Sequence, residues 1–172
     1  MVKSGDVKML GLLYERYKTW LFNFFYQMNK DTDLSEDLVQ NVFVRLLKYK
    51  HTYTEDSKFV TWIFQIARNE SHDHYRKNKK HNKSESIEDV AYKLSDQQNV
   101  QSEIEDVESI KLLHRAIDKL SFEKKEIIVL SKLRQLQYRE IGKIIGCSEA
   151  NARIKAHRAF KELKAMYLTM QN

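Results

Sequence analysis

The sequence contains no proline, four glycines and one cysteine in 172 residues. Because proline and glycine punctuate β-rich folds, their scarcity favours a chain that is helical nearly throughout. Cys147 stands alone and cannot form an internal disulfide, which indicates a reducing compartment. No stretch is long and apolar enough to span a bilayer, and the start, MVKSGDVKML, lacks a signal-peptide pattern. We therefore expect an all-α protein in the cytoplasm.

Patterns for catalysis and metal binding are also missing. His72, His74 and His81 lie in a basic run without an accompanying cluster of carboxylates or cysteines, and neither metal-ligand nor triad spacing occurs. No glycine-rich phosphate loop is present. We expect no enzyme, no metal and no cofactor. Cys147 is interpreted as a small packing residue, and its exposure would leave a redox role open.

Charge is unevenly distributed along the chain. The net charge is +6, and the hydrophobic share of 42% is sufficient for packed cores. Acidic side chains dominate from Ser84 to Glu108, which predicts a flexible linker over 84–105. The linker would join two small helical domains, 1–83 and 106–172. From Lys111 onward basic residues outnumber acidic ones, as expected of a phosphate binder.

The most informative pattern lies between Leu133 and Leu163. Apolar residues recur at helical spacing, Gly142 leaves room for a closely packed partner helix, Gly146 ends the first helix and Ser148 caps the next. The second helix has alanines on one face and polar or cationic residues on the other, namely Asn151, Arg153, Lys155 and Arg158. This pattern predicts a helix-turn-helix whose second helix enters a DNA major groove. An ordinary helical hairpin with a solvated basic face is the alternative.

Three further helices are predicted in the first 83 residues. The first, from Val7 to Lys30, carries an aromatic stripe that we assign to the core. The second follows to Lys50, with buried rows that include Leu47 and a polar outer face that is either solvated or a docking surface. The third runs from about Lys58 to Lys80. Its basic end is either a frayed terminus or a contact for single-stranded DNA.

The motifs of the two halves resemble one known family. DLSEDLVQNVFVRLLKY followed by FVTWIFQIARNESHDHYRK resembles region 2 of the bacterial extracytoplasmic-function (ECF) sigma factors. LSFEKKEIIVLSKLRQLQYREIGKIIGCSEANARIKAHRAFKEL resembles their region 4, in the same order and across a comparable linker. The resemblance covers nearly the whole chain. It implies a sigma factor, which binds core RNA polymerase, directs it to promoters and helps to melt the −10 element.

The resemblance also implies three groups of site residues. The residues expected to dock on the β′ clamp helices of the polymerase are Asp37, Leu38, Gln40, Asn41, Phe43 and Arg45. Those expected at the −10 element, where a flipped base would be held near Asn69, are Thr52, Tyr53, Lys58, Asn69, Arg76 and Lys77. Those expected at the −35 element are Ser148, Glu149, Asn151, Arg153, Lys155 and Arg158. Further expected partners are the β flap and an anti-sigma factor.

Two alternatives remain open on the sequence. A stand-alone helix-turn-helix regulator would have no need for the face between Asp37 and Arg45, and a sigma mimic that sequesters an anti-sigma factor would have no need for both sets of basic residues. The chain also departs from the family pattern. Asn41 stands where Glu is usual, and ANARIKAHRA replaces GTVKSRLHRA, which puts Ile154 at a typically polar position.

Overall fold

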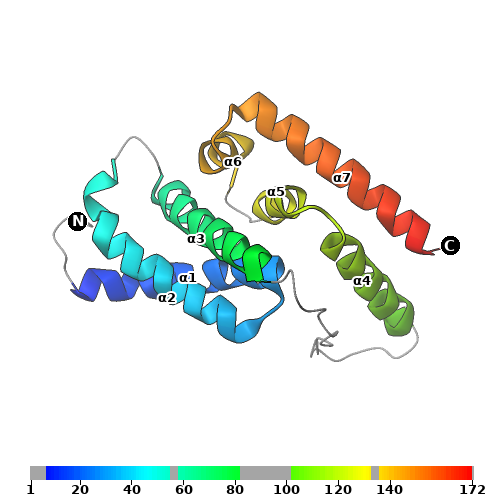
Figure 1. The fold of residues 1–172 in the computed structure, drawn as a ribbon, viewed down its shortest axis with the longest axis horizontal. Coiled ribbons are helices and arrows are strands. Elements are labelled where there is room, and N and C mark those ends of the chain that lie inside the picture. Colours follow the sequence, from blue (N-terminus) through cyan, green and yellow to red (C-terminus); the bar gives the residue numbers. More distant parts are fainter. Residues whose placement is uncertain (1–6, 55–57, 82–101, 133–135, 172) are drawn as a thin grey trace.

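The computed structural model describes residues 7–54, 58–81, 102–132 and 136–171. Within these ranges all regular secondary structure is helical, which confirms the all-α prediction (Figure 1). The helices are α1 (Val7–Asn29), α2 (Thr32–Tyr49), the short 3-10 helix η2 (Lys50–Thr52), α3 (Phe59–His81), α4 (Ser102–Asp118), α5 (Phe122–Lys132), α6 (Tyr138–Ile145) and α7 (Glu149–Gln171). Most of the predicted linker lies outside the described residues, but α4 begins at Ser102, inside the range 84–105.

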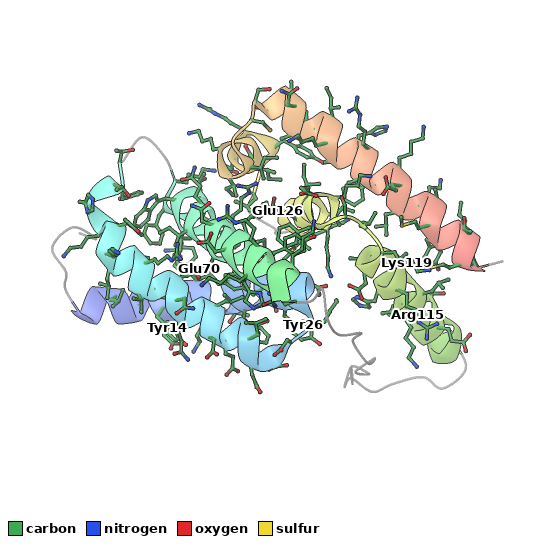
Figure 2. All side chains as sticks on the ribbon, viewed as in Figure 1. Tyr14, Tyr26, Glu70, Arg115, Lys119 and Glu126 are labelled. Atoms are coloured by element: carbon green, nitrogen blue, oxygen red, sulfur yellow. The ribbon has the colours of Figure 1, made fainter. Side chains whose placement is uncertain are left out.

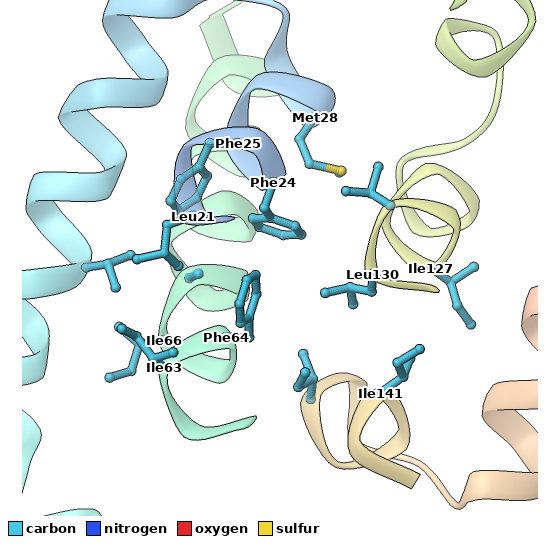
Figure 3. Packing of buried hydrophobic residues seen from close by; sticks show 14 of the residues in the cluster. Leu21, Phe24, Phe25, Met28, Ile63, Phe64, Ile66, Ile127, Leu130 and Ile141 are labelled. Atoms are coloured by element: carbon cyan, nitrogen blue, oxygen red, sulfur yellow. The ribbon is translucent and has the colours of Figure 1, made fainter. Parts of the chain in front are cut away.

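Helices α1, α2 and α3 form the N-terminal module around an aromatic core. Leu21, Phe24 and Phe25 of α1 are fully buried, as the spacing of apolar residues predicts (Figure 3). Phe64 of α3 is fully buried as well, although it was not among the residues expected on the inner face of that helix. The Phe24 and Phe64 rings meet edge to face, with centroids 5.8 Å apart. The aromatic stripe of α1 is therefore structural.

One residue of α2 was wrongly predicted as buried. The α2 helix packs on α1 and α3, and its row from Leu38 to Leu46 is covered by them. Leu47 is 43% exposed, because it lies on the side of α2 that neither neighbour covers. Val44 is exposed on the same helix.

Helices α4 to α7 form the C-terminal module, in which α6 and α7 make the predicted helix-turn-helix. Gly146 adopts a left-handed conformation with φ of 75°, and the Asn151 N–H donates to the Ser148 hydroxyl at 3.2 Å. Space for a side chain at Gly142 is filled by the backbone of the turn, because an added Cβ would lie 2.7 Å from the Cys147 carbonyl oxygen. The close contact at Gly142 is therefore with the turn, and not with a partner helix as predicted.

The two modules contact each other through α3, which packs on α6, and through α1, which packs on α5. Glu126 of α5, labelled in Figure 2, is only 2% exposed. Its carboxylate accepts from Arg68 Nε at 3.2 Å. His72 Nε2 lies 2.7 Å from the other Glu126 oxygen, and the Tyr75 ring stacks on Phe122 with centroids 4.2 Å apart. These pairings join residues far apart in the chain, and no pattern in the sequence predicts them.

No helix in the described ranges combines the length and hydropathy that a membrane-spanning helix needs. Within the same ranges, no group of three or more His, Cys, Asp or Glu side chains is placed to hold a metal ion.

Candidate nucleic-acid interface

The outer face of α2 carries the residues predicted to meet the polymerase. Asp37, Gln40 and Asn41 are exposed side by side on this helix. Leu38 and Phe43 are instead buried, with 4% and 7% exposed, and they fix the orientation of the helix against the core. The predicted group thus divides into three exposed polar residues, two core residues and the half-buried Arg45.

Arg45 belongs to an ion-pair network that ties α2 to α3. Its guanidinium pairs with the buried carboxylate of Glu70, and its Nη2 lies 3.2 Å from Asp73 Oδ2. Arg76 pairs with the same Asp73. The hydrogen bond from Arg76, assisted by Arg45, lowers the pKa of Asp73 below its usual range in spite of partial burial. The network holds α2 and α3 in a fixed relation.

Tyr53, which precedes α3, forms an aromatic cluster with residues of the first turn of that helix. Trp62 Nε1 donates to the Thr52 hydroxyl at 3.3 Å, and this hydroxyl donates to the Tyr49 carbonyl at 2.8 Å. The Tyr53 ring lies against Trp62 and Phe59, with centroids 5.3 and 5.6 Å away. Thr52 remains exposed at the edge of this cluster. The loop residues 55–57 lie outside the described ones.

Lys58 connects the two modules. Its Nζ lies 2.5 Å from Glu140 Oε1, and the other oxygen of Glu140 accepts from the Gln137 N–H at 2.5 Å. Burial alone would raise the pKa of Glu140, but the hydrogen bonds from Lys58 and from the Gln137 backbone outweigh it and lower the pKa. A residue predicted to bind DNA is thus engaged within the molecule.

The remaining predicted −10 residues share the exposed surface of α3. Asn69 and Arg76 are seven residues apart and therefore lie on one face, with Lys77 beside them. Gln65, Arg68 and His72 lie on a neighbouring face, toward the C-terminal module. The contact between modules leaves Asn69, Arg76 and Lys77 open to solvent.

All six predicted −35 residues lie at the surface: Ser148, which caps α7, and Glu149, Asn151, Arg153, Lys155 and Arg158 in the N-terminal half of α7. Ala152, Ala156 and Ala159 are fully buried on the opposite side and hold α7 close to its neighbours. Arg153 donates from Nη2 to Glu149 at 2.7 Å, and its guanidinium lies 5.0 Å from the centre of the Tyr138 ring. Lys155 and Arg158 have no ion pair within the described ranges, so their charges face solvent.

An apolar groove of about 500 Å³ lies between α4 and α7. Its lining is largely aliphatic and aromatic, with contributions from Ile110, Leu113, Phe160, Leu163 and Tyr167. No site residue was predicted on this surface.

A two-module helical protein with one helix-turn-helix and exposed basic residues on both modules has the architecture of a promoter-binding factor. The family model for sigma-70 region 2 matches residues 13–81, and that for sigma-70 region 4 matches residues 110–163. The chain is 36% identical over 155 residues to the ECF RNA polymerase sigma factor SigM of Bacillus subtilis, covering 90% of this chain and 93% of SigM. It is 28% identical over 156 residues to SigX of the same organism, covering 89% and 80%.

The chain therefore belongs to the ECF subfamily of RNA polymerase sigma factors. A solved structure supports the fold: the sigma factor RpoE of Bartonella quintana, in complex with the anti-sigma factor NepR, aligns with a TM-score of 0.74 at 22% identity. That alignment covers 93% of this chain and 97% of RpoE. As a sigma factor the protein binds core RNA polymerase and directs it to promoters. The stand-alone regulator and the sigma mimic receive no support from these similarities.

Proposed function

We propose that this sigma factor recognises the −35 element with α7, holds the melted −10 element on α3 and docks on polymerase with α2. The observation that carries the proposal is the surface of α7. Three fully buried alanines fix its rotation, so every residue of the predicted −35 group faces outward. A helix of this shape and charge fits a major groove, with cations directed to the phosphates.

At the −10 element, the surface of α3 offers both cations and an amide. Arg76 and Lys77 can neutralise the backbone of a single strand, and the exposed amide of Asn69 can form hydrogen bonds with an unstacked base. The aromatic cluster of Tyr53 and Trp62 lies at the start of the same helix. Extruding a base costs about a few kcal/mol, which binding energy can supply. The protein thus acts by binding and not as an enzyme.

On the polymerase side, the exposed polar residues Asp37, Gln40 and Asn41 form the docking face for the β′ clamp helices. Arg45 contributes at its edge and is held in place by Glu70 and Asp73. The apolar groove between α4 and α7 fits an apolar helix, and we assign it to the β flap. An anti-sigma factor would compete for these surfaces, and the protein works in the cytoplasm, where the polymerase is.

The test uses holoenzyme reconstituted from bacterial core polymerase on a promoter that it transcribes in a run-off assay. Replacing Lys155 and Arg158 by Gln should lower the salt dependence of promoter binding by about one unit of slope for each phosphate that is no longer neutralised. The control is the double variant Lys111→Gln with Lys119→Gln, which removes the same charge from exposed positions in and just after α4. An unchanged slope in the first variant would refute the assignment of α7.

The same assay tests α3. Asn69→Ala should impair permanganate-reactive open complexes more than closed-complex binding, because its amide acts on the unpaired base. Asn78→Ala, an exposed asparagine further along α3, is the matched control. Equal losses in both complexes would remove the base-holding role of Asn69.

A further inference from the structure

Ile154 occupies the outermost position of α7. At about 100° per residue, it lies about 200° around the helix from Ala152, and so nearly opposite the buried alanines that fix the rotation. Its side chain is 48% exposed. On the helical net its neighbours three and four residues away are Ala150, Asn151, His157 and Arg158, all of them exposed. A branched apolar side chain thus stands at the centre of a polar and cationic face.

A single exposed apolar residue is ordinary on a protein surface, so exposure alone does not indicate a function for Ile154. Its position on the outer face of α7 does. The centre of a helix face that enters a major groove approaches the edges of the bases, whereas residues on its flanks reach the phosphates. Arg153 and Lys155 lie on the two flanks of Ile154, one residue to either side and about 100° away. Ile154 is therefore directed at base edges.

The floor of the major groove offers hydrogen-bond donors, acceptors and one apolar group, the C5-methyl of thymine. An isoleucine cannot pair with donors or acceptors and would leave them desolvated, but it can pack on this methyl. We infer that Ile154 contacts the 5-methyl group of a thymine in the −35 element and makes that thymine a determinant of promoter specificity. The inference rests on the proposed role of α7.

One of the two flanking cations, Arg153, already has partners within the molecule. Arg153 donates to Glu149 from Nε at 3.2 Å and from Nη2 at 2.7 Å, and it lies over the Tyr138 ring. These contacts direct its guanidinium back toward α6. The Arg153 side chain therefore does not cover Ile154, and the Ile154 side chain can approach the bases.

The experiment compares thymine with deoxyuridine, which lacks only the 5-methyl group. Holoenzyme first selects its preferred −35 sequence from duplexes randomised at this element, and each selected thymine is then replaced by deoxyuridine in turn. The wild-type holoenzyme should bind about fourfold more weakly at one such position, the effect of one methyl group removed from water. Ile154→Ser should bind the thymine promoter about fourfold more weakly and lose the difference between the two bases.

Leu168→Ser is the matched control. Leu168 is also 48% exposed and belongs to the same helix, near its C-terminal end. This variant should keep the wild-type response to deoxyuridine, which separates a base contact from a general effect of losing an exposed apolar side chain.

Three outcomes would overturn the inference: a selected −35 element without thymine, a wild type indifferent to deoxyuridine at every position, or an Ile154→Ser variant with the wild-type response. Failure of the proposed function looks different. In that case binding would not depend on the −35 sequence at all, and selection would return random sequence.

Discussion

The N-terminal and C-terminal modules differ in the size of the side chains that lie between their helices. In the N-terminal module large side chains such as Phe24, Phe25 and Phe64 fill the space between helices. In the C-terminal module α7 approaches on fully buried alanines, and the turn after α6 lies against Gly142. The first arrangement depends on large side chains that fill the space between the helices. The second depends on small side chains that leave no such space. We therefore expect loss of volume to damage the N-terminal module and gain of volume to damage the C-terminal one.

The modules also differ in how they hold their candidate site residues. In the N-terminal module Arg45, Lys58 and Arg76 all form ion pairs. In α7 Arg153 pairs with Glu149, but Lys155 and Arg158 form no ion pair with the residues that the structure describes. Cations that already form ion pairs stabilise the folded surface, but they must exchange partners to bind DNA. The unpaired cations of α7 can bind phosphates without breaking a contact.

The largest effect should follow from Phe25→Ala, which removes a fully buried ring from the N-terminal module. We expect a loss of about 3–5 kcal/mol in the free energy of unfolding, from lost burial and the remaining cavity. Both tryptophans, Trp20 and Trp62, lie in this module, so the urea transition followed by their fluorescence should move to lower concentration. An unchanged fluorescence transition would show that the core does not depend on this ring.

The complementary change is Gly142→Ala in the C-terminal module. The new Cβ would lie 2.7 Å from a backbone oxygen, which cannot rotate away as a side chain can. We expect a destabilisation of about 1–3 kcal/mol, visible by circular dichroism and much weaker in tryptophan fluorescence.

Gly11→Ala is its matched control, because a Cβ at Gly11 meets nothing within 4 Å. Within α1 this change should stabilise by up to about 1 kcal/mol. Equal effects of the two alanines would contradict the role assigned to close packing in the helix-turn-helix.

A smaller effect is expected at the contact between modules. Glu126→Gln keeps the shape of the side chain but weakens its hydrogen bonds with Arg68 and His72, at a cost of about 1–2 kcal/mol. The unfolding transitions followed by fluorescence and by circular dichroism should move apart, since the modules are then less strongly coupled. Glu162→Gln breaks an ion pair with Lys124 inside the C-terminal module and should leave the coupling unchanged.

The smallest effect should be a pH dependence at a second contact between modules. His114 Nδ1 lies 3.3 Å from Lys30 Nζ. Burial first, and then the charges of Lys30 and Lys125, lower the pKa of His114, although Asp118 opposes them. The unfolded chain therefore takes up the proton more readily, and this contribution to stability is lost as the pH falls below about 6.5.

His114→Gln should reduce this loss of stability between about pH 7 and pH 5, as measured by thermal unfolding. His157→Gln, at an exposed position of α7, should keep the wild-type profile. Identical profiles for wild type and His114→Gln would exclude a contribution from this contact.

The sequence predicted local features well because their causes lie within a few residues. The helix-turn-helix follows from Gly146 and Ser148, and the inward face of α7 follows from the spacing of its alanines. The exposed positions of Asn69 and Asp37 follow from the same periodicity. Each of these features depends only on residues that are close together in the sequence.

Features that depend on a distant neighbour could not be predicted. Glu126 precedes an apolar run, and nothing near it in sequence indicates that Arg68 and His72 surround it. Leu47 continues an apolar row but points where no helix packs. By contrast, the burial of Leu38 and Phe43 follows from the apolar rows of α2, although the family resemblance grouped them with the exposed docking residues.

The ion pair between Lys58 and Glu140 keeps the two proposed DNA-binding surfaces close together, and this limits the length of duplex that they can span at once. The −10 and −35 elements are about 25 base pairs apart, which is about 85 Å of duplex at about 3.4 Å per base pair. The surfaces proposed to hold them are joined by the 2.5 Å pair at the start of α6, and α6 itself is about 12 Å long. Duplex DNA is stiff over this interval. With the proposed assignments, the closed molecule spans too little of the duplex to hold both elements, so the modules must separate where α3 packs on α6 and where α1 packs on α5 before both elements are bound.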